Sequence, residues 1–344
     1  MNANSMPRRQ QRPRTLARWL IIVAAIVLVM VVVGGVTRLT ESGLSMVRWQ
    51  PISGFVPPLN AEQWIAEFKA YQATPEYLKI NRGMSLDEFK AIFFWEYLHR
   101  VIGRIIGLAM ILPLAWFAWK RAIPKGYTWR LVALTALVVF QGAIGWWMVA
   151  SGLIDRPDVS HLRLATHLLT ALFFFGGLIW TALDLLALDR NAQARPARLS
   201  AASIAVLLIL AIQLLLGAFT AGLDAGFAFS SWPLMGDAFF PDGGWHDGWS
   251  AMHNAIDNPI VVQFLHRWWA WIAAGAALLF GRKVRPQWPA APLVIGLLVI
   301  TQIMLGIGTL LSGVAIPIAA AHQAVAVLLL ASLVYGAHRL GLRR

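Results

Sequence analysis

Cysteine is absent from this sequence of 344 residues, and charged residues make up only 13% of it. The lack of cysteine excludes thiolate metal sites, haem attached through cysteine, and disulfide bonds. With 58% hydrophobic residues, the chain is too apolar for an ordinary soluble protein. The low content of charged residues indicates a membrane protein, and the absence of cysteine means that any chemistry depends on side chains other than thiols.

Long apolar runs are abundant. A helix rises ~1.5 Å per residue, so about 20 apolar residues cross the ~30 Å hydrocarbon core of a bilayer. We therefore predict an all-α integral membrane protein with eight transmembrane helices. The first run follows an Arg-rich tail as in a signal peptide, but its length and the lack of a clear cleavage site favour a retained anchor. The predicted spans are residues 16–37, 90–119, 129–150, 160–187, 200–222, 259–280, 291–312 and 317–338.

The charges are distributed unevenly along the chain. The formal net charge is +13, and basic residues gather in the N-terminal tail, in the second, fourth and sixth connections, and at the C-terminus. The connection 223–258 instead holds five Asp and no Lys or Arg. By the positive-inside rule, this predicts a multi-pass protein of the bacterial cytoplasmic (inner) membrane with both termini cytoplasmic. The basic excess thus reports topology and excludes a nucleic-acid partner as its explanation.

The chain also repeats itself, which predicts two four-helix bundles related by a pseudo-two-fold axis along the membrane normal. Leu98-His99-Arg100 matches Leu265-His266-Arg267, and Gly34-Gly35-Val36-Thr37 resembles Gly217-Ala218-Phe219-Thr220. Gln141 and Gly145 match Gln302 and Gly306, and His167 matches His322. The predicted divisions are a disordered cytoplasmic tail (1–15), an N-terminal bundle (16–188) with a long outer loop (39–89), a cytoplasmic linker (189–199), and a C-terminal bundle (200–344) with an outer loop (223–258).

The first outer loop carries local folding signals. Asn60 can cap a short interfacial helix that places Trp64, Phe68 and Tyr71 on one side. Ser85 and Glu88 have the spacing of a capping box at the start of the second long helix. Loops of this length are more often functional than idle, so we expect both outer loops to act as lids.

Four histidines lie inside the apolar stretches, at His99, His167, His266 and His322. Counted at ~1.5 Å per residue from the outer end of each helix, all four fall in one layer of the outer leaflet. A lone histidine in a membrane helix is more often a packing residue, but four at one depth, two per half, favour ligation. Two imidazoles that face each other across a bundle form a b-type haem site. Copper or zinc is the alternative, although no carboxylate or thiolate accompanies the second pair.

Three arginines lie near the same layer and are candidates for pairing with haem propionates. They are Arg100, Arg163 and Arg267. The alternative for each is snorkelling to lipid headgroups. The remaining histidines have no partner in the repeat and are left out of the predicted site: His161, expected at the interface, and His246, His253 and His338.

Glu96 is the strongest single signal for chemistry. Ionisable groups in a bilayer are expensive to bury and are usually kept for a function. The matching position of the second half is Gln263, which cannot take up or release a proton. If both halves merely held electron-transfer haems, a carboxylate in only one of them would be hard to explain. A base beside a porphyrin suits proton removal, and the alternative is an internal ion pair between Glu96 and Arg100.

These features together resemble the haem A synthase family, and the resemblance covers the chain from about residue 20 to residue 338. The residues that carry it run from Gly34 to Ser45 and from Glu96 to Arg100, and include His167, Leu265-His266-Arg267 and His322. Some members of that family have a cysteine pair in an outer loop. This sequence has none, so a thiol relay is not available to it.

The resemblance implies oxidation of the C8 methyl group of haem O to the formyl group of haem A, the cofactor of aa3-type cytochrome oxidases. It implies that His266 and His322 ligate a resident haem b and that His99 and His167 hold the substrate haem. The contrast between Glu96 and Gln263 points the same way, and our hypothesis is that Glu96 is catalytic, taking the proton or stabilising the cationic intermediate. Successive hydroxylations with water-derived oxygen would send electrons out through haem b to an acceptor that the sequence does not identify. Expected partners are membrane lipid and the farnesyl-transferring haem O synthase, and a homo-oligomer is compatible with the sequence.

Two other classes of protein remain open. A di-haem b-type membrane cytochrome for quinol electron transfer accounts for four histidines but not for Glu96. A transporter with parallel repeats would need another use for the histidine pairs. Pigment analysis separates the first class from a haem A synthase, and a haem stain of the purified protein separates the second.

Overall fold

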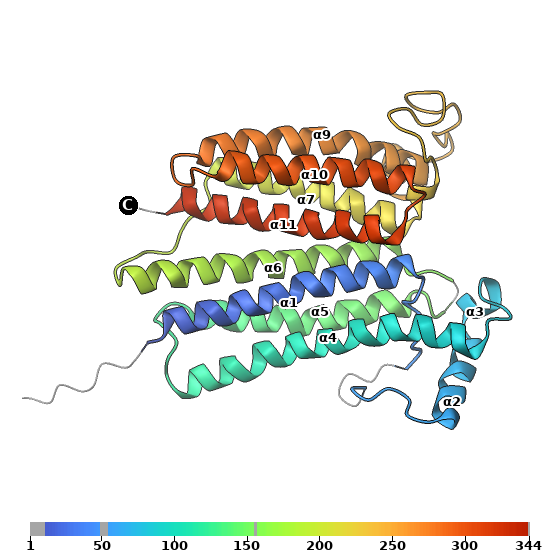
Figure 1. Cartoon of the computed structure of the whole chain (residues 1–344), viewed down its shortest axis with the longest axis horizontal. Coiled ribbons are helices and arrows are strands. Elements are labelled where there is room, and N and C mark those ends of the chain that lie inside the picture. Colours follow the sequence, from blue (N-terminus) through green and yellow to red (C-terminus); the bar gives the residue numbers. More distant parts are fainter. Residues whose placement is uncertain (1–10, 49–53, 155–156, 343–344) are drawn as a thin grey trace, which may run out of the picture.

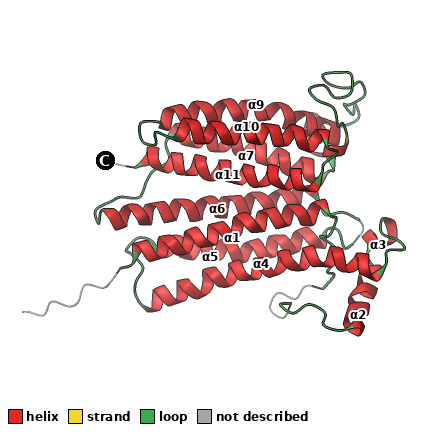
Figure 2. Ribbon diagram, viewed as in Figure 1, coloured by secondary structure: helices red, strands yellow, loops and turns green. Residues whose placement is uncertain are grey.

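The computed structural model describes residues 11–48, 54–154 and 157–342. Within these ranges the secondary structure is helical and contains no strand (Figure 2). The long helices are α1 (Pro13–Leu39), α4 (Leu86–Trp119), α5 (Thr128–Ala150), α6 (His161–Arg190), α7 (Ala201–Gly222), α9 (Pro259–Val284), α10 (Ala291–Leu311) and α11 (Ile316–Gly341). The short ones are α2 (Ala61–Gln72), α3 (Pro75–Lys79), the 3-10 turn η1 (Ala225–Phe227) and α8 (Ala251–Asp257).

The long helices run side by side (Figure 1). Helices α1, α4, α5 and α6 contact one another around a ring, as do α7, α9, α10 and α11. Contacts of α1 with α11, and of α6 with α7 and α11, join the two sets. One hydrophobic core includes buried side chains from both sets, among them Leu20, Leu178 and Leu333.

Seven helices of the described chain are long and apolar enough to cross a membrane: α1, α4, α5, α6, α7, α10 and α11. The protein is therefore an all-α membrane protein. The remaining predicted span, 259–280, lies in α9, which is 26 residues long. Its apolar character is interrupted by Gln263, His266 and Arg267, so its place as the eighth span stays a prediction.

The helix ends follow capping chemistry and therefore differ by a few residues from the predicted hydrophobic spans. Helix α1 begins at Pro13, inside the tail predicted as disordered, because proline is favoured in the first turn of a helix. Helix α9 begins at Pro259, where the Asn258 side chain accepts hydrogen bonds from the amides of Ile260 and Val261.

Figure 1 shows α1 beginning and α11 ending at one end of the bundle, which we call the terminal end. Here the amide of Arg198, in the connection before α7, donates to the carbonyl of Gly341 (3.1 Å). The opposite end carries α2 and α3, together with the connection between α7 and α9. We call it the lobe end.

The lobe formed by α2, α3 and the first turns of α4 confirms two local predictions. The Asn60 side chain caps α2, and Ser85 with Glu88 forms the complete capping box of α4. The aromatic face of α2 does not lie free at an interface, because its rings pack on Phe89 and Phe93 of α4. The Tyr71 ring, for example, is 5.2 Å from that of Phe89, centre to centre.

The lobe buries one carboxyl group that the sequence analysis did not single out. Glu76 is only 4% exposed, and one of its oxygens, Oε2, has no hydrogen-bond partner among the described residues. Burial raises the pKa of Glu76 to about 8; a hydrogen bond from Tyr71 opposes this shift, and the negative charge of Glu96 adds to it. The Tyr71 hydroxyl in turn accepts a hydrogen bond from Asn81 (2.8 Å).

We expect the lobe to lose stability as the pH rises from about 4.5 to about 8. Across this window the unfolded lobe releases the Glu76 proton while the folded lobe retains it, which costs up to about 1.4 kcal/mol per pH unit. Hydrogen exchange of the α2 and α3 amides, corrected for intrinsic rates, should show protection falling over this range. Glu76→Gln should flatten the profile and give at least tenfold greater protection at pH 8 than the wild type. Glu62→Gln, at an exposed site on α2, should leave the slope unchanged; an unchanged slope in Glu76→Gln would contradict the assignment.

Candidate functional site

Each of the four predicted histidines packs against a glycine of a neighbouring helix. A Cβ atom built on any of these glycines would lie 3.0–3.1 Å from the imidazole ring, closer than real side chains tolerate without a shift. Only glycine lets helix and ring approach to this distance. The pairs are Gly34 with His99, Gly145 with His167, Gly217 with His266, and Gly306 with His322.

The histidines also come together in the expected pairs. The ring centres of His266 and His322 are 6.5 Å apart, and the ring planes are nearly perpendicular at 87°. Two imidazoles that bind one metal from opposite sides at ~2 Å place their ring centres on the order of 6 Å apart. His99 and His167 lie close enough to interact electrostatically. These contacts join α9 to α11 and α4 to α6.

Glutamines on the neighbouring helices orient three of the rings. Gln141 donates to the His167 carbonyl (2.7 Å), and its amide nitrogen is 3.1 Å from Nδ1 of that ring. Gln213 meets the carbonyl and Nδ1 of His266 in the same way, at 3.2 and 3.1 Å. His322 Nδ1 lies 3.1 Å from the Gln302 carbonyl oxygen. Because an acceptor faces Nδ1 of His322, that nitrogen carries the ring proton and Nε2, which lies 3.4 Å from the Gln302 amide nitrogen, is the unprotonated one. At His167 and His266 an amide donor faces Nδ1, which places the ring proton on Nε2 in the chain alone.

Glu96 is 3% exposed and sits in a cage made by the chain that follows α1. Its Oε2 accepts hydrogen bonds from the Ser45 hydroxyl and the Met46 amide, both at 2.7 Å. Its Oε1 accepts from Arg100 at 2.6 Å, an ion pair across one turn of α4. Arg100 also donates to the carbonyls of Met46 (2.8 Å) and Arg48 (3.0 Å). The ion pair that the sequence analysis considered as an alternative is therefore present. Arg100 donates hydrogen bonds both to Glu96 and to the backbone of the loop.

The second half repeats this cage with an amide in place of the acid. Gln263, 2% exposed, donates to the Phe229 carbonyl (3.0 Å) and accepts from Arg267 (3.1 Å). Arg267 also donates to the carbonyls of Phe229 and Ser231 (3.0 and 2.9 Å). In both halves, an arginine four residues after the acid or amide thus donates hydrogen bonds to the loop that follows the first helix of that half, which is α1 or α7. The two cages differ in charge and in hydrogen-bond direction, because Glu96 accepts from the loop whereas Gln263 donates to loop carbonyls.

Arg163 lies apart from both cages. It donates to the Trp147 carbonyl (2.7 Å), and its guanidinium stacks 4.6 Å from the Trp147 ring centre. A role toward propionates stays a prediction for all three arginines.

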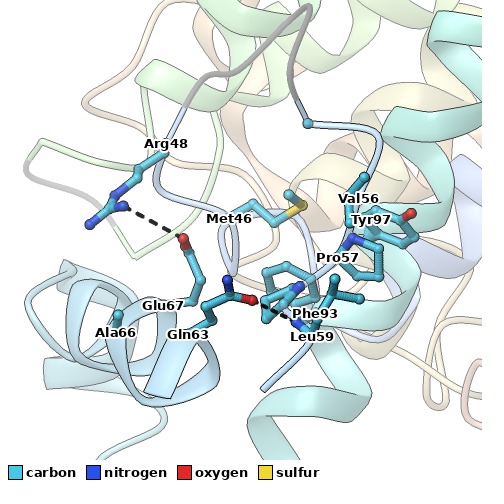
Figure 3. A pocket seen from close by; sticks show the side chains of 12 residues that line it. Met46, Arg48, Val56, Pro57, Leu59, Gln63, Ala66, Glu67, Phe93 and Tyr97 are labelled. Atoms are coloured by element: carbon cyan, nitrogen blue, oxygen red, sulfur yellow. Dashed lines mark hydrogen bonds and ion pairs between the residues drawn. The ribbon is translucent and has the colours of Figure 1, made fainter. Parts of the chain in front are cut away.

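A pocket of about 330 Å³ lies beside the Glu96 cage (Figure 3). Phe93 and Tyr97 of α4, which flank Glu96 in the sequence, line it together with Met46 and Pro57. Met46 thus lines the pocket with its side chain while its amide binds the carboxylate. Opposite these apolar groups, Arg48 and Glu67 form an ion pair at 3.8 Å.

The two histidine pairs are linked through α1. Gly34 contacts His99, while a Cβ atom on the next residue, Gly35, would overlap the amide of Gln323. Gln323 directly follows His322 in α11. Adjacent glycines of one helix therefore touch a predicted ligand of the first half and the neighbour of a predicted ligand of the second.

The histidines left out of the predicted site have other surroundings. His161 was expected at the interface but is only 7% exposed; its Nε2 is 3.3 Å from a carboxylate oxygen of Asp257, across the two helix sets. The rings of His246 and His253 both stack on Trp249, at 4.5 and 3.9 Å between ring centres. Within the described residues, no group of three or more His, Asp or Glu side chains could hold a metal ion.

Sequence reasoning missed a buried charged cluster at the terminal end. The Asp184 carboxylate is fully buried in α6, where it pairs with Arg130 of α5 and with His338 of α11 (2.9 Å). It also accepts a hydrogen bond from the Ala197 amide (2.9 Å), which fixes the connection between the helix sets. A carboxylate in the apolar stretch 160–187 was the available signal, since the same reasoning had selected Glu96. Its partners are distant in sequence and could not be read from spacing.

Comparison with known proteins identifies relatives along almost the whole chain. Residues 17–334 match the COX15-CtaA family, described as cytochrome oxidase assembly protein. Proteins named heme A synthase are 56% identical in Sphingopyxis alaskensis (96% of this chain, 94% of the relative) and 56% identical in Rhizorhabdus wittichii (96% and 95%). A heme A synthase of Novosphingobium aromaticivorans is 48% identical, with both chains covered completely.

The glycine contacts lead to a direct prediction. Gly145→Val should reduce the haem bound per purified chain, because its Cβ would lie 3.0 Å from Cε1 of His167 and its branches would push that ring aside. Gly142→Val is the matched control on the same helix, where a Cβ meets no atom within 4 Å. Haem content measured by pyridine haemochrome should fall in the first variant and stay at the wild-type level in the second. Equal haem content in both would show that the His167 contact is not part of a haem site.

Proposed function

Because the chain belongs to the COX15-CtaA family of cytochrome oxidase assembly proteins, we propose that it is a haem A synthase that converts the C8 methyl of haem O to a formyl group. It is an enzyme of haem A biosynthesis, an oxidoreductase, with several membrane-spanning helices. The reaction is the last step toward the cofactor of aa3-type oxidases. Haem O would arrive from the farnesyl-transferring haem O synthase.

The proposed architecture has eight spans in two bundles related by a pseudo-two-fold axis. The support is the recurrence of matched contacts: a glycine against each histidine, and an arginine four residues after Glu96 and after Gln263. We place the terminal end in the cytoplasm of a bacterial cell and the lobe end outside the inner membrane. Basic residues flank the terminal end, and the connection 223–258 carries only acidic charge.

A resident haem b fits the second half. His266 and His322 are spaced for two imidazoles on one iron, and Nδ1 of His322 donates to the Gln302 carbonyl, as a metal-binding imidazole does with its other nitrogen. The Oε1 atoms of Gln213 and Gln302 are buried without a partner among the described residues, which marks this contact region as incomplete in the chain alone. When bound there, haem b supplies a one-electron relay toward an acceptor outside the chain.

The first half would hold the substrate through His99 and His167. Ligation of the haem O iron on both faces leaves the ring periphery free, so holding the substrate does not block oxidation at a methyl group. Arg100, Arg163 and Arg267 remain candidates for propionate contacts, although in the chain alone each donates to backbone carbonyls.

The chemistry proceeds in two hydroxylations with water-derived oxygen. Each step adds one oxygen atom to the methyl carbon and releases two electrons and two protons. The second product is a gem-diol that loses water to give the aldehyde. The protein must therefore remove protons in a region that water reaches poorly.

Glu96 is the group that we assign to this task, and its contrast with Gln263 is the observation that carries the proposal. Three neighbouring groups donate hydrogen bonds to the Glu96 carboxylate. A carboxylate can accept about four hydrogen bonds, so three of its acceptor positions are used. One position remains for a water or a substrate proton. Ser45, Met46 and Arg100 fix its orientation, and Arg100 offsets its charge within the membrane.

Pigment analysis tests the function directly. In a host that contains haem O but lacks its own enzyme, expression of this chain should produce haem A, seen by chromatography of extracted haems. A variant with both His99 and His266 changed to Ala should not. Appearance of bound b haem without any haem A would instead support the di-haem cytochrome.

Exchange of the central acid tests the catalytic role. Glu96→Gln keeps the side-chain length and the Oε1 contact with Arg100, places an NH2 group against the Met46 amide, and removes the base. Bound haem should stay near the wild-type amount, because the histidines are unchanged, while haem A formation falls at least 100-fold. Gln263→Glu is the mirror control and should still form haem A. Turnover of Glu96→Gln at the wild-type rate would dispose of the assignment.

A further inference from the structure

Glu76 of α3 is a buried acid that the proposed mechanism does not yet use. It is 4% exposed, and its Oε2 has no hydrogen-bond partner among the described residues. The Tyr71 hydroxyl of α2 donates a hydrogen bond to the carboxyl group. Buried polar atoms are normally hydrogen-bonded, so an oxygen that is not calls for an explanation. The unpartnered oxygen leaves Glu76 able to take up and release a proton.

The core of the lobe connects Glu76 to the Glu96 cage. The Tyr71 ring belongs to a buried aromatic cluster with two rings of α4, and Met46 and Tyr97 pack against the same cluster. Met46 binds the Glu96 carboxylate through its amide, and Tyr97 directly follows Glu96 in α4. The residue that donates to Glu76 therefore lies in the same packed unit as two neighbours of Glu96.

Glu76 also interacts with acids that water can reach. Glu41, in the turn after α1, and Asp158, in the connection before α6, are both exposed. Their negative charges and that of Glu96 all raise the pKa of Glu76, so each of the three lies within electrostatic reach of it. Lys79, the basic residue of α3, is exposed. Glu76 is thus a buried acid that interacts both with Glu96 and with the outer surface.

The interaction between the two buried acids works in both directions. The charge of Glu96 raises the pKa of Glu76, so a proton on Glu96 must lower that pKa by the same amount. While Glu96 is ionised, Glu76 keeps its proton at neutral pH, because burial and the nearby charges bring its pKa to about 8. Once Glu96 has taken a proton, Glu76 becomes a stronger acid than before and releases its own more readily.

We propose that Glu76 is the proton-release group of the reaction, which gives its proton to water at the lobe end and then takes up the proton held by Glu96. Each oxidation step yields two protons, and both leave in this way, one after the other. Only O–H bonds form and break in the transfer, and both carboxyl groups return to their starting states. The electrons leave by the route already proposed. Glu76 acts through Glu96, and the inference rests on the proposed function for the source of the protons.

Removal of the acid is the first test. Full-length protein in detergent is supplied with haem O and with ferricyanide as electron acceptor. Haem A formation by the wild type should rise with pH and level off above about pH 8, as the ionised fraction of Glu76 grows. Glu76→Gln imitates the protonated acid, so it should bind the wild-type amount of haem, but it should lose this rise and form haem A at least about tenfold more slowly. Glu62→Gln, at an exposed site on α2, should keep the wild-type rate and profile.

A second variant shifts the titration of the acid without removing it. The hydrogen bond from Tyr71 lowers the pKa of Glu76. Tyr71→Phe keeps the buried ring but removes the donor, so the rise in rate should move to higher pH while the plateau rate stays within about twofold of the wild type. This variant keeps the proposal testable if Glu76→Gln does not fold. A rise that stays at the wild-type pH in Tyr71→Phe would overturn the proposal.

Infrared difference spectroscopy follows the proton itself and needs no turnover. The carbonyl band of protonated Glu76 should disappear as the pH passes about 8, and it should be absent from Glu76→Gln. In Glu96→Gln the same band should titrate at a pH lower by on the order of half a unit, because the charge of Glu96 is gone. An unchanged titration in Glu96→Gln would overturn the coupling between the two acids.

The outcomes separate this inference from the proposed function. Wild-type protein that forms no haem A would contradict the function, and the infrared titration would still test the coupling of Glu76 to Glu96. Haem A formation at the same rate and with the same pH profile in the wild type and in Glu76→Gln would overturn the proton-release role and leave the function standing.

Discussion

The close approach of a glycine to each of four imidazoles is the constraint on which the rest of the structure depends. Histidine is bulky and polar, so a membrane helix that carries one must find space and a partner for it. The glycines provide the space, because a Cβ atom at those positions would press on the ring. With the helices at this distance, the carbonyls and amides of the neighbouring helix can orient the rings, and opposing rings can meet across the bundle. The pairing of the histidines therefore depends on the glycines that lie against their rings.

Charged groups in the core form a second common feature, because each has oppositely charged or hydrogen-bonding partners nearby. Glu96 pairs with Arg100 and binds the loop between α1 and α2. Gln263 and Arg267 make the matching contacts with the connection between α7 and α9, where the central side chain is uncharged. At the opposite end, Asp184 gathers Arg130, His338 and a backbone amide. Such clusters cost desolvation, which their ion pairs and hydrogen bonds offset in part, since Nε of Arg267 and Nδ1 of His338 have no hydrogen-bond partner among the described residues. The Glu96 cage adjoins a pocket, which Met46 and Arg48 also line.

Much of this arrangement could be predicted from sequence, because period, depth and repetition are local signals. The histidines, the contrast between Glu96 and Gln263, and the caps at Asn60 and Ser85 all came from spacing of a few residues. The Asp184 cluster could not be predicted, since its partners lie 54 and 154 positions away. The Gln213 contact was also missed, because its counterpart in the first half is a methionine and the repeat therefore shows no match there. Both contacts join residues that are far apart in the sequence and meet only in the folded protein.

The contact of Gly35 with Gln323 has a consequence for biogenesis. Helix α1 leaves the ribosome long before α11, yet the two lie against each other in the folded protein. During synthesis, the face of α1 that receives α11 must wait exposed to lipid or to the insertion machinery until nearly the whole polypeptide has been made. A nascent chain that stalls before α11 would leave that seam open and should be recognised by membrane quality control as unfinished.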